Sequence, residues 1–568
     1  MKLITRLTIL LMMSTVIFTS CKKSAPRQTK HIPKNAVFVA AINTKAITAK
    51  LAKSEATIEN LFKSMAESDT AMNDGKKEWE EFRNAGIDLS ENFYVSVVQQ
   101  GGGMGMGGGN NVITGIGGLK DAAKLEAYIK KKQPTAQVKK EKDYSYAIME
   151  GSTMVAWADD LVMVMNNSSS GGNMNFDSAT GQMNFDKPAD AETDMKTEMA
   201  AYFNMKEDES VATIPEFREL MQDNADGSFW INSASTMENM PIPLPKVKEL
   251  VENSFTAATL NFEDGKVVVD TKSYSSSALN DILKKYAGPT VDLNMIAKYP
   301  SNNINGFLSF AFNPEIINAI VSYLELKAIA DDQLTKIFNG ALTVQDVTKA
   351  LKGDMAIIVS DFTVPKADTV NGAMPAASPM KMIINIPVGD KVQMNRLMDK
   401  LVEMGMMMKA GNEYRATEAL SKSGYQVVVD DKNLLAASDL ETLNQYKAGT
   451  AKAGISGDVM GGLKDKIAVV YVNIESLLNG FPVNANDAGM NAIMPKAKAT
   501  FRDATGYADN FNGKFTGGHM ELRFKNEKEN SLVSLLQFFG EANKANKMGF
   551  GNQRDFEMEA IDSTTVTE

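Results

Sequence analysis

The sequence predicts an α+β protein with mostly antiparallel sheets. One observation is a pattern that occurs four times: an apolar run rich in β-branched or aromatic residues, an Asn, and then a helix-forming segment. The four residues are Asn43, Asn232, Asn313 and Asn473. An Asn side chain can accept a hydrogen bond from a backbone N–H that the first helical turn leaves unpaired. Each pattern therefore predicts a strand followed by an Asn-capped helix.

A second observation is internal duplication. Residues 32–288 resemble residues 299–545, with VFVAAIN echoed by FLSFAFN and NFEDGKVVVDTKSY echoed by NFNGKFTGGHMELRF. The elements read βαββαβ over residues 37–150 and again over 305–430, an order typical of a ferredoxin-like unit. We therefore predict two similar halves, each built from two βαββα units.

The last matched segments of the halves each contain a turn signal. Asp264-Gly265 and Asn512-Gly513 tolerate the positive φ of a hairpin, so each segment predicts two paired strands. The segments SALNDILKKY and NSLVSLLQFF follow them and predict short amphipathic helices. YSYAIMEGSTMVAWADDL, earlier in the first half, is matched to YQVVVDDKNLLAASDL in the second.

The N-terminus has the pattern of an export signal. Lys2 and Arg6 precede an apolar run over residues 7–18, which is too short to span a bilayer, and small residues lead to Cys21. Cys21 is the single cysteine of the 568 residues. The pattern resembles a bacterial lipoprotein signal, in which the Cys becomes the acylated first residue of the mature chain. We expect a signal peptide over 1–20 and lipidation of Cys21, with an ordinary secretory signal as the alternative.

Residues 21–31 are interpreted as a lipidated tether, with the folded body starting at residue 32. The tether carries Lys22, Lys23, Arg27 and Lys30, and basic residues near a membrane are attracted to anionic lipids. No acidic run follows Cys21. By analogy with lipoproteins of Bacteroidota, this favours an outer-membrane protein that faces the periplasm.

Composition restricts the class of protein. Hydrophobic residues make up 44% and charged residues 23%, as in ordinary globular chains. The net charge of −10 comes from scattered acids, which argues against a nucleic-acid partner because such partners require a clustered basic face. Polar or Gly-rich composition predicts mobile loops over residues 101–110, 166–194 and 363–380, and a flexible tail over 546–568.

Several of these features together resemble a known family. The lipoprotein start, the opening IPKNAVFVAAIN, the length and the duplicated halves are similar to a Bacteroidota lipoprotein family of unknown function, catalogued as domain of unknown function 4836. The resemblance implies a location in the cell envelope and an architecture of two duplicated halves. It implies no catalytic residue, because the family has no established activity.

Glycine motifs give no nucleotide site. Gly103, Gly105 and Gly108 formally fit GxGxxG, but a strand follows them where a dinucleotide site requires a helix. Gly115 and Gly117, with the neighbouring Gly118, are interpreted as a simple strand-to-helix turn.

Metal and nucleophilic chemistry also lack support. The two histidines are His31, in the tether, and His519, in a predicted strand. Two histidines are too few for a zinc site with several His ligands, so such a site is excluded. The 36 methionines, including Met404 and Met406–Met408 at a helix end, favour adaptable core packing over copper. We predict no cofactor and no metal.

Carboxylate pairs and tryptophans are interpreted structurally. Asp159-Asp160 and Asp430-Asp431 fall between strands, where Asp is a common turn residue. In the alignment of the two halves, Glu150 of the first half is matched to Asp430 of the second. Trp79, Trp157 and Trp230 are expected in the core.

The sequence thus predicts an outer-membrane lipoprotein that acts as a non-enzymatic binding or scaffolding module. Its partners are the membrane, through Cys21, and an envelope protein. The alternative is an enzyme such as a carboxylate-dependent hydrolase. A pocket lined by converging acids favours the enzyme, whereas a broad apolar surface favours binding.

Overall fold

The computed structural model describes residues 25–52, 77–78, 80–100, 110–149, 153–168, 174–177, 182–185, 191–238, 245–340, 342–364, 380–421, 424–481 and 488–542. These residues are organised by one long sheet of 21 strands. Every strand pair in the sheet is antiparallel. The predicted α+β class with antiparallel pairing is therefore confirmed.

The strands of the two halves follow one another in the same order outward from the β13–β23 pair, which joins the halves. On one side the order is β13 (Lys266–Tyr274), β12 (Phe255–Glu263), β11 (Gly227–Asn232), β1 (Phe38–Ile42), β3 (Phe93–Gln100), β4 (Asn110–Leu119), β8 (Leu161–Ser168), β7 (Thr153–Ala158), β6 (Ser145–Met149) and β5 (Lys139–Lys140). On the other it is β23 (Thr516–Phe524), β22 (Phe501–Ala508), β21 (Ala468–Val472), β14 (Ile304–Ala311), β15 (Asp354–Ser360), β16 (Lys381–Pro387), β20 (Asn433–Ala437), β19 (Gln426–Val429), β18 (Glu413–Ala416) and β17 (Met407–Ala410). The short β2 (Ile87–Asp88) pairs with the end of β4.

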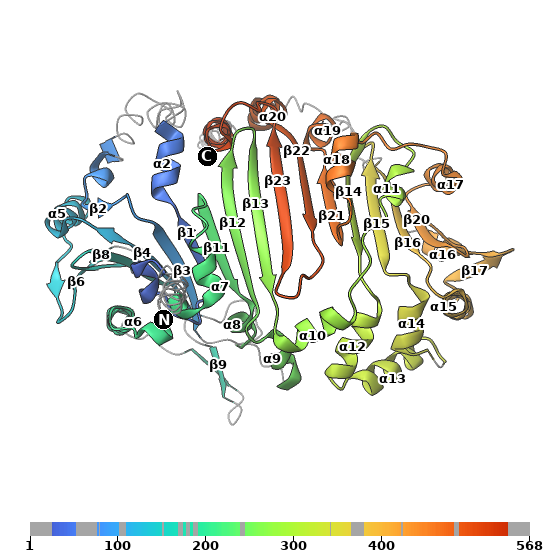
Figure 1. Ribbon diagram of the computed structural model, residues 1–568, viewed down its shortest axis with the longest axis horizontal. Coiled ribbons are helices and arrows are strands. Elements are labelled where there is room, and N and C mark those ends of the chain that lie inside the picture. Colours follow the sequence, from blue (N-terminus) through green and yellow to red (C-terminus); the bar gives the residue numbers. More distant parts are fainter. Residues whose placement is uncertain are drawn as a thin grey trace, which may run out of the picture.

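Helices gather at the two ends of the middle strands and around the outer strands (Figure 1). Those of the first half are η1 (Arg27–His31), α2 (Thr44–Ala52), α5 (Ala122–Lys132), α6 (Ala191–Phe203), η2 (Glu207–Glu209), η3 (Val211–Thr213), α7 (Pro215–Leu220), α8 (Ser233–Glu238), α9 (Pro245–Val251) and α10 (Ser277–Lys285). Those that follow are α11 (Asn294–Ala297), α12 (Glu315–Tyr323), α13 (Lys327–Ile337), α14 (Val344–Ala350), α15 (Lys391–Glu403), α16 (Glu418–Ser421), α17 (Leu440–Ala448), α18 (Gly457–Gly462), α19 (Ile474–Asn479) and α20 (Ala488–Thr500). Residues 531–542 form a further helix. None of the helices in the described residues is long and apolar enough to cross a membrane.

The ferredoxin-like arrangement predicted for each unit is wrong. In that arrangement two strands joined by a helix are parallel and are separated by a third strand. Here β1 pairs directly with β3, and the pairing is antiparallel. The physical reason lies in α2, which continues beyond the end of β1 (Figure 1) and buries none of its residues. A parallel connection would need a helix that packs back across the sheet.

The predicted Asn caps are confirmed in all four places. Each side-chain Oδ1 accepts a hydrogen bond from a backbone N–H two or three residues further on. The donors are Ala46 for Asn43 (3.0 Å), Ser235 for Asn232 (3.1 Å), Glu315 for Asn313 (3.0 Å) and Ser476 for Asn473 (2.9 Å).

The two turn signals are also confirmed. Gly265 (φ +69°) and Gly513 (φ +96°) lie in the connections that precede β13 and β23, with positive φ. A Cβ at Gly265 would come within 2.5 Å of the backbone of Glu527, so this connection requires glycine for space as well as for conformation.

The loop predicted over residues 166–194 is partly wrong. Within it, β9 (Met174–Asp177) and β10 (Gln182–Phe185) pair as a separate antiparallel hairpin. The repeated segment Met-Asn-Phe alternates apolar and polar residues, which is the period of a strand.

Four apolar clusters pack against the sheet. On one face, α7 packs Phe217 against Trp230 of β11, and α17 covers the second half through Tyr446. On the opposite face, α5 packs Leu125 against the outer strands of the first half, and α15 packs Met398 against those of the second. Both faces are thus covered near the outer strands, and the middle of the sheet has fewer covering elements.

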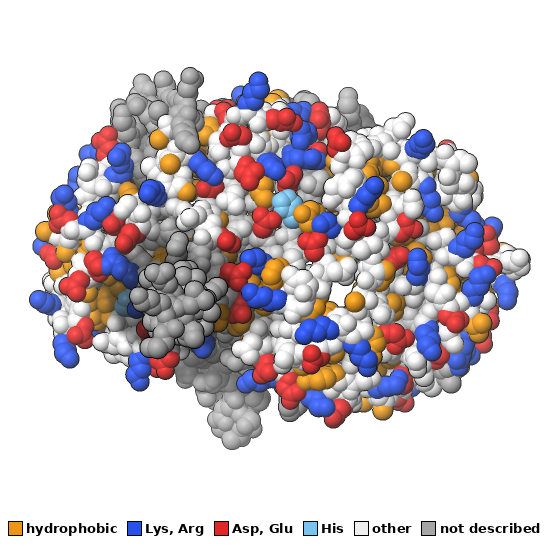
Figure 2. All heavy atoms as spheres, viewed as in Figure 1, with side chains coloured by type: hydrophobic (Ala, Val, Ile, Leu, Met, Phe, Trp, Pro, Cys, Tyr) orange, Lys and Arg blue, Asp and Glu red, His pale blue; other side chains and the backbone are white. Residues whose placement is uncertain are grey.

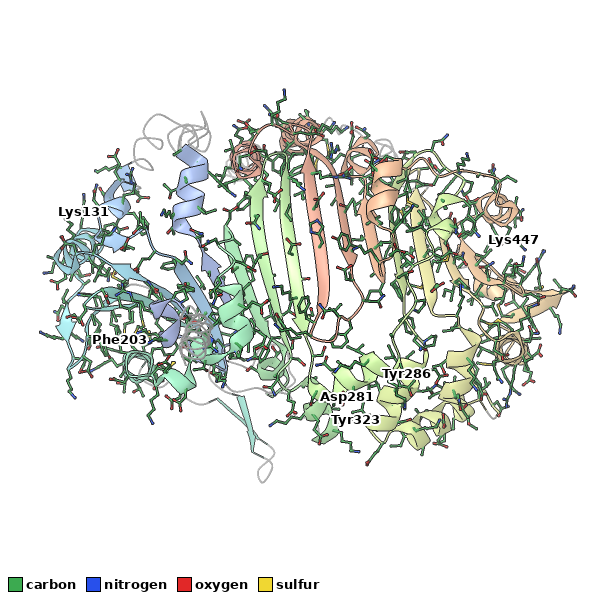
Figure 3. All side chains as sticks on the ribbon, in the orientation of Figure 1. Lys131, Phe203, Asp281, Tyr286, Tyr323 and Lys447 are labelled. Carbon is green, nitrogen blue, oxygen red and sulfur yellow. The ribbon has the colours of Figure 1, made fainter. Side chains whose placement is uncertain are left out.

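The halves also meet at one end of the middle strands, where α9 lies beside α12 (Figure 1). The hydroxyl of Tyr323 on α12 (labelled in Figure 3) donates to Glu249 at 2.6 Å. Lys246 of α9 forms an ion pair with Glu325 at 2.6 Å. These contacts supplement the β13–β23 pairing between the halves.

Candidate functional site

One face of the sheet is apolar across eleven neighbouring strands, from β3 to β16. Residues paired in antiparallel strands lie on the same face, so the register identifies its side chains. A first row reads Phe93, Ile42, Gly227, Leu260, Val269, Met520, Gly506, Val470, Leu308, Ile357 and Ile384. A second row beside it reads Val95, Ala40, Phe229, Ala258, Thr271, Gly518, Ala508, Ala468, Phe310 and Met355. We call these two rows the open face.

The open face remains accessible to water over the middle strands. Ile42 is 43% exposed, Leu308 is 41% exposed and Met520 is 54% exposed. Neighbouring residues in β1 and β14 point to the other side and are buried, as in the case of Ala41 and Phe307, each at 4%. Continuous exposed apolar area of this extent marks an interaction surface in soluble proteins.

Helices stand on this same face at its two ends. Leu125 and Ile129 of α5 pack with Val162. Val162 is paired with Gly117 of β4, and β4 is paired with β3 through Gly115 and Val95, so Val162 lies on the same side of the sheet as the open face. At the other end, Met398 of α15 packs with Leu434, which is paired with Ile386. The open face therefore lies between two helical ridges.

Glycines shape one end of the open face. Gly115 and Gly117 were predicted in a strand-to-helix turn, but both lie inside β4. The ring of Phe93 occupies the space above them, because a Cβ at either position would come within 2.9 or 3.0 Å of that ring. The glycines thus make room for an aromatic side chain.

The opposite face of the middle strands holds a cleft between the two halves. His519 of β23 is paired in register with Asp270 of β13 and Tyr507 of β22. Its Nδ1 lies 2.7 Å from Asp270 Oδ1, and its ring stacks on Tyr507 with centroids 5.1 Å apart. The cleft has a volume of about 300 Å³ and is also lined by acidic residues of α7 and of the strand ends: Glu216, Glu219, Asp223 and Asp509. Lys and Arg alternate with Asp and Glu over the visible side of the molecule (Figure 2).

The carboxylates of the cleft are held by cations. Glu219 is bonded to Lys272 and Lys514, each at 2.9 Å, and these hydrogen bonds lower the pKa of its carboxyl below the usual value. Glu521 does not line the cleft but lies 3.4 Å from Nε2 of His519, which does. Burial alone would raise the pKa of Glu521, but its contacts with Lys266 and His519 outweigh burial and lower that pKa as well. A general acid requires the opposite shift.

The two Asp pairs occupy matching turns. Asp159-Asp160 joins β7 to β8 and Asp430-Asp431 joins β19 to β20, which occupy the same places in the sheet order of each half. The sequence alignment that matched Glu150 to Asp430 is therefore wrong by one strand, because Asp430 corresponds to Asp159. Asp430 Oδ1 accepts from the backbone N–H of Lys432 and Asn433 at 2.8 and 2.9 Å, so the turn interpretation is confirmed for it.

His31 lies in the folded body. Residues 27–31 form η1, in which Gln28 and Thr29 are buried, so the body begins before the predicted residue 32. His31 Nδ1 lies 3.0 Å from the carbonyl oxygen of Tyr202, and burial lowers the pKa of its imidazole. Arg27 pairs with Asp160 and with Glu91. Residues 27–31, which were assigned to the predicted tether, therefore belong to the folded body.

The structure also places the tryptophans and methionines that the sequence analysis discussed. Trp157 and Trp230 are buried as expected. Met407 is buried in β17, whereas Met404, Met406 and Met408 are exposed, and α15 ends before all of them. No group of three or more His, Cys, Asp or Glu is placed to hold a metal in the described ranges.

Some predictions concern residues outside the described ranges. They include Cys21, Trp79, the motif at Gly103, Gly105 and Gly108, and the tail from residue 546. Most of the predicted mobile loops over 101–110 and 363–380 also lie there.

Comparisons with known proteins identify a family. The model of a family described as a domain of unknown function (DUF4836) matches residues 28–356, more than half of the chain. Its start agrees with the first buried residue, Gln28. No curated protein matches the chain.

Among solved structures, crystal forms IV and III of TP0453 are similar at 12% identity with a TM-score of 0.24, and form I at 10% with 0.23. They cover 44 to 45% of this chain and 80 to 83% of their own. These values are too low to support an argument about fold or function.

Proposed function

Because the chain belongs to the family of domain of unknown function 4836, whose model carries no activity, we propose a function from its surfaces. The protein is a non-enzymatic lipoprotein of the cell envelope that binds an apolar partner on the open face. The observation that carries this proposal is the open face itself. An uncovered apolar surface costs solubility and stability, so its persistence over eleven strands calls for a partner that covers it.

The location follows from the N-terminal sequence. Lipidation of Cys21 anchors the chain to the outer membrane on its periplasmic side, as in the Bacteroidota lipoproteins that it resembles. The support is the position of the single cysteine directly after a signal-like apolar run. More than one acyl chain is needed for stable anchoring, and a triacylated cysteine meets this need.

Metabolic labelling with a fatty-acid analogue tests the anchor. We expect the wild-type protein to take up label, and Cys21→Ser to appear unlabelled, folded and soluble in the periplasm. A Cys21→Ser protein that remains in the membrane fraction would contradict the anchor.

Duplication is part of the same proposal. Residues 32–288 and 299–545 are proposed as duplicate α+β halves, each containing two βαββα units. The equal strand order on the two sides of β13–β23 supports this, as do the four Asn-capped strand–helix starts.

The enzyme alternative has one observation in its favour, the acids that converge on the cleft. The lowered pKa of Glu219, which lines the cleft, weighs against it, because it keeps this carboxyl ionised and leaves no proton to donate near neutral pH. The open face therefore supports binding better than the cleft supports hydrolysis.

A pull-down from native membranes tests the binding surface. We expect the wild-type protein to retain a partner that the double variant Leu308→Glu, Met520→Glu loses. Ile329→Glu is a matched control, since Ile329 is 59% exposed and lies on helix α13, not on a strand of the open face. Equal retention by all three proteins would exclude the open face as the binding surface.

A further inference from the structure

We propose that the open face holds the acyl chains of membrane phospholipids. The inference rests on the proposed function and adds the chemical class of the partner. It follows from the chemistry of the face, from the two helices at its ends and from the length of chain that precedes the body.

The chemistry of the open face suits hydrocarbon better than a protein. Eleven strands spaced about 4.8 Å apart and two rows of residues give an area on the order of 600 Å². A protein interface of that size carries about three to six hydrogen bonds. Among the residues of the two rows, Thr271 is the single one with a polar side-chain atom. The backbone groups of these strands are engaged by neighbours on both sides. An acyl chain needs no hydrogen bonds.

The end helices disfavour a second copy of this chain. Face-to-face sheets pack about 10 Å apart, and a helix with its side chains is about 10 Å thick. Since α5 and α15 both rise from this face, aligned copies would drive them into the strands or helices of the partner. Acyl chains are much thinner than a helix and fit between the two ridges.

The tether places phospholipids within reach. Gln28 is already buried, and it lies seven residues after Cys21. Seven extended residues span at most about 25 Å. A body anchored through Cys21 therefore stays next to the bilayer surface, where phospholipid is the most abundant apolar ligand.

Transfer of a fluorescent phospholipid tests the proposal. Vesicles of phosphatidylethanolamine and phosphatidylglycerol carry a phospholipid with a self-quenching fluorophore on one acyl chain. The acceptor is the full mature chain with Cys21→Ser. We expect fluorescence to rise as lipid moves to the protein, with saturation.

Two variants and a control decide which surface is responsible. We expect Leu308→Glu to weaken transfer about tenfold, since it replaces an apolar contact by a charge. Met520→Lys, with the opposite charge, should do the same, and Ile329→Glu should behave as the parent. Circular dichroism on each variant checks that it is folded. Native mass spectrometry of the parent should show bound phospholipid.

Three outcomes overturn the inference. If no lipid transfers while the pull-down partner still depends on Leu308 and Met520, the binding surface stands and its occupant is a protein. If the parent sediments as a dimer that Leu308→Glu dissociates, the occupant is a second copy. If the parent takes up no lipid and the pull-down partner is retained equally with and without the Leu308 and Met520 substitutions, the proposed function is rejected as well.

Discussion

Phe307 and Leu308 are neighbours in β14 that face opposite sides of the sheet, so truncating each to alanine measures how well each side is covered. Phe307 is buried, pairs in register with Ile358 and contacts the ring of Tyr471 with centroids 5.5 Å apart. Leu308 is 41% exposed on the open face. The two substitutions leave the same backbone and the same strand partners.

The expected costs differ by several-fold. Phe307→Ala leaves an enclosed cavity, and such changes lower the free energy of unfolding by about 3 to 5 kcal/mol. Leu308→Ala removes atoms that are already partly hydrated and leaves no enclosed cavity. Its cost is limited to the buried part of the side chain, about 1 kcal/mol.

Urea unfolding followed by circular dichroism measures both values. The Cys21→Ser chain without lipid is the parent. The expected result is a large shift of the midpoint for Phe307→Ala and a small one for Leu308→Ala, with unchanged slopes. Equal shifts above about 3 kcal/mol would mean that another part of the chain covers the open face in solution, and would refute the reasoning on which both proposals depend.

Three further predictions test local interactions. The carboxyl of Glu219 has a folded-state pKa below its unfolded value near 4.5, so its contribution to stability is present above that value and is lost as pH falls through the folded pKa. Glu219→Gln should therefore flatten the dependence of the urea midpoint on pH between about 5 and 3, and an unchanged slope would contradict this. Asn473→Ala should cost about 1 kcal/mol in urea unfolding and Asn473→Asp much less, since Asp also caps helices. Gly117→Ala should cost about 1 to 3 kcal/mol because its Cβ would press on the ring of Phe93; Phe93→Leu in the same chain should recover part of it, and strict additivity would argue against the contact.

Local features of the fold were predictable from short patterns. The apolar runs in VFVAAIN and FLSFAFN predicted β1 and β14, and an Asn at the end of each predicted the helix that follows. Such features depend on neighbouring residues, whose chemistry the sequence states directly. The parallel connection of a ferredoxin-like unit was a tertiary assumption, and it failed where α2 continued past the end of β1.

The two surfaces were not predictable, for different reasons. Asp270 and His519 are 249 residues apart, and only the β13–β23 pairing makes them neighbours. The open face does have a signal in the sequence: strands such as IAVVYV are apolar on both sides, which is the pattern of sheets covered on both faces. The helices cover both faces only near the outer strands.

The pairing of β13 with β23 also constrains how the chain reaches its fold. Until residues 516–524 arrive, β13 is the terminal strand of the first half, and its unpaired backbone groups are a template for aggregation. Lys266, Asp270 and Lys272 lie on this strand, and charged side chains on an exposed edge oppose wrong pairing. We expect these charges to oppose wrong pairing of the first half while the chain folds. Asp270 and Lys272 then line the cleft once β23 has paired with β13.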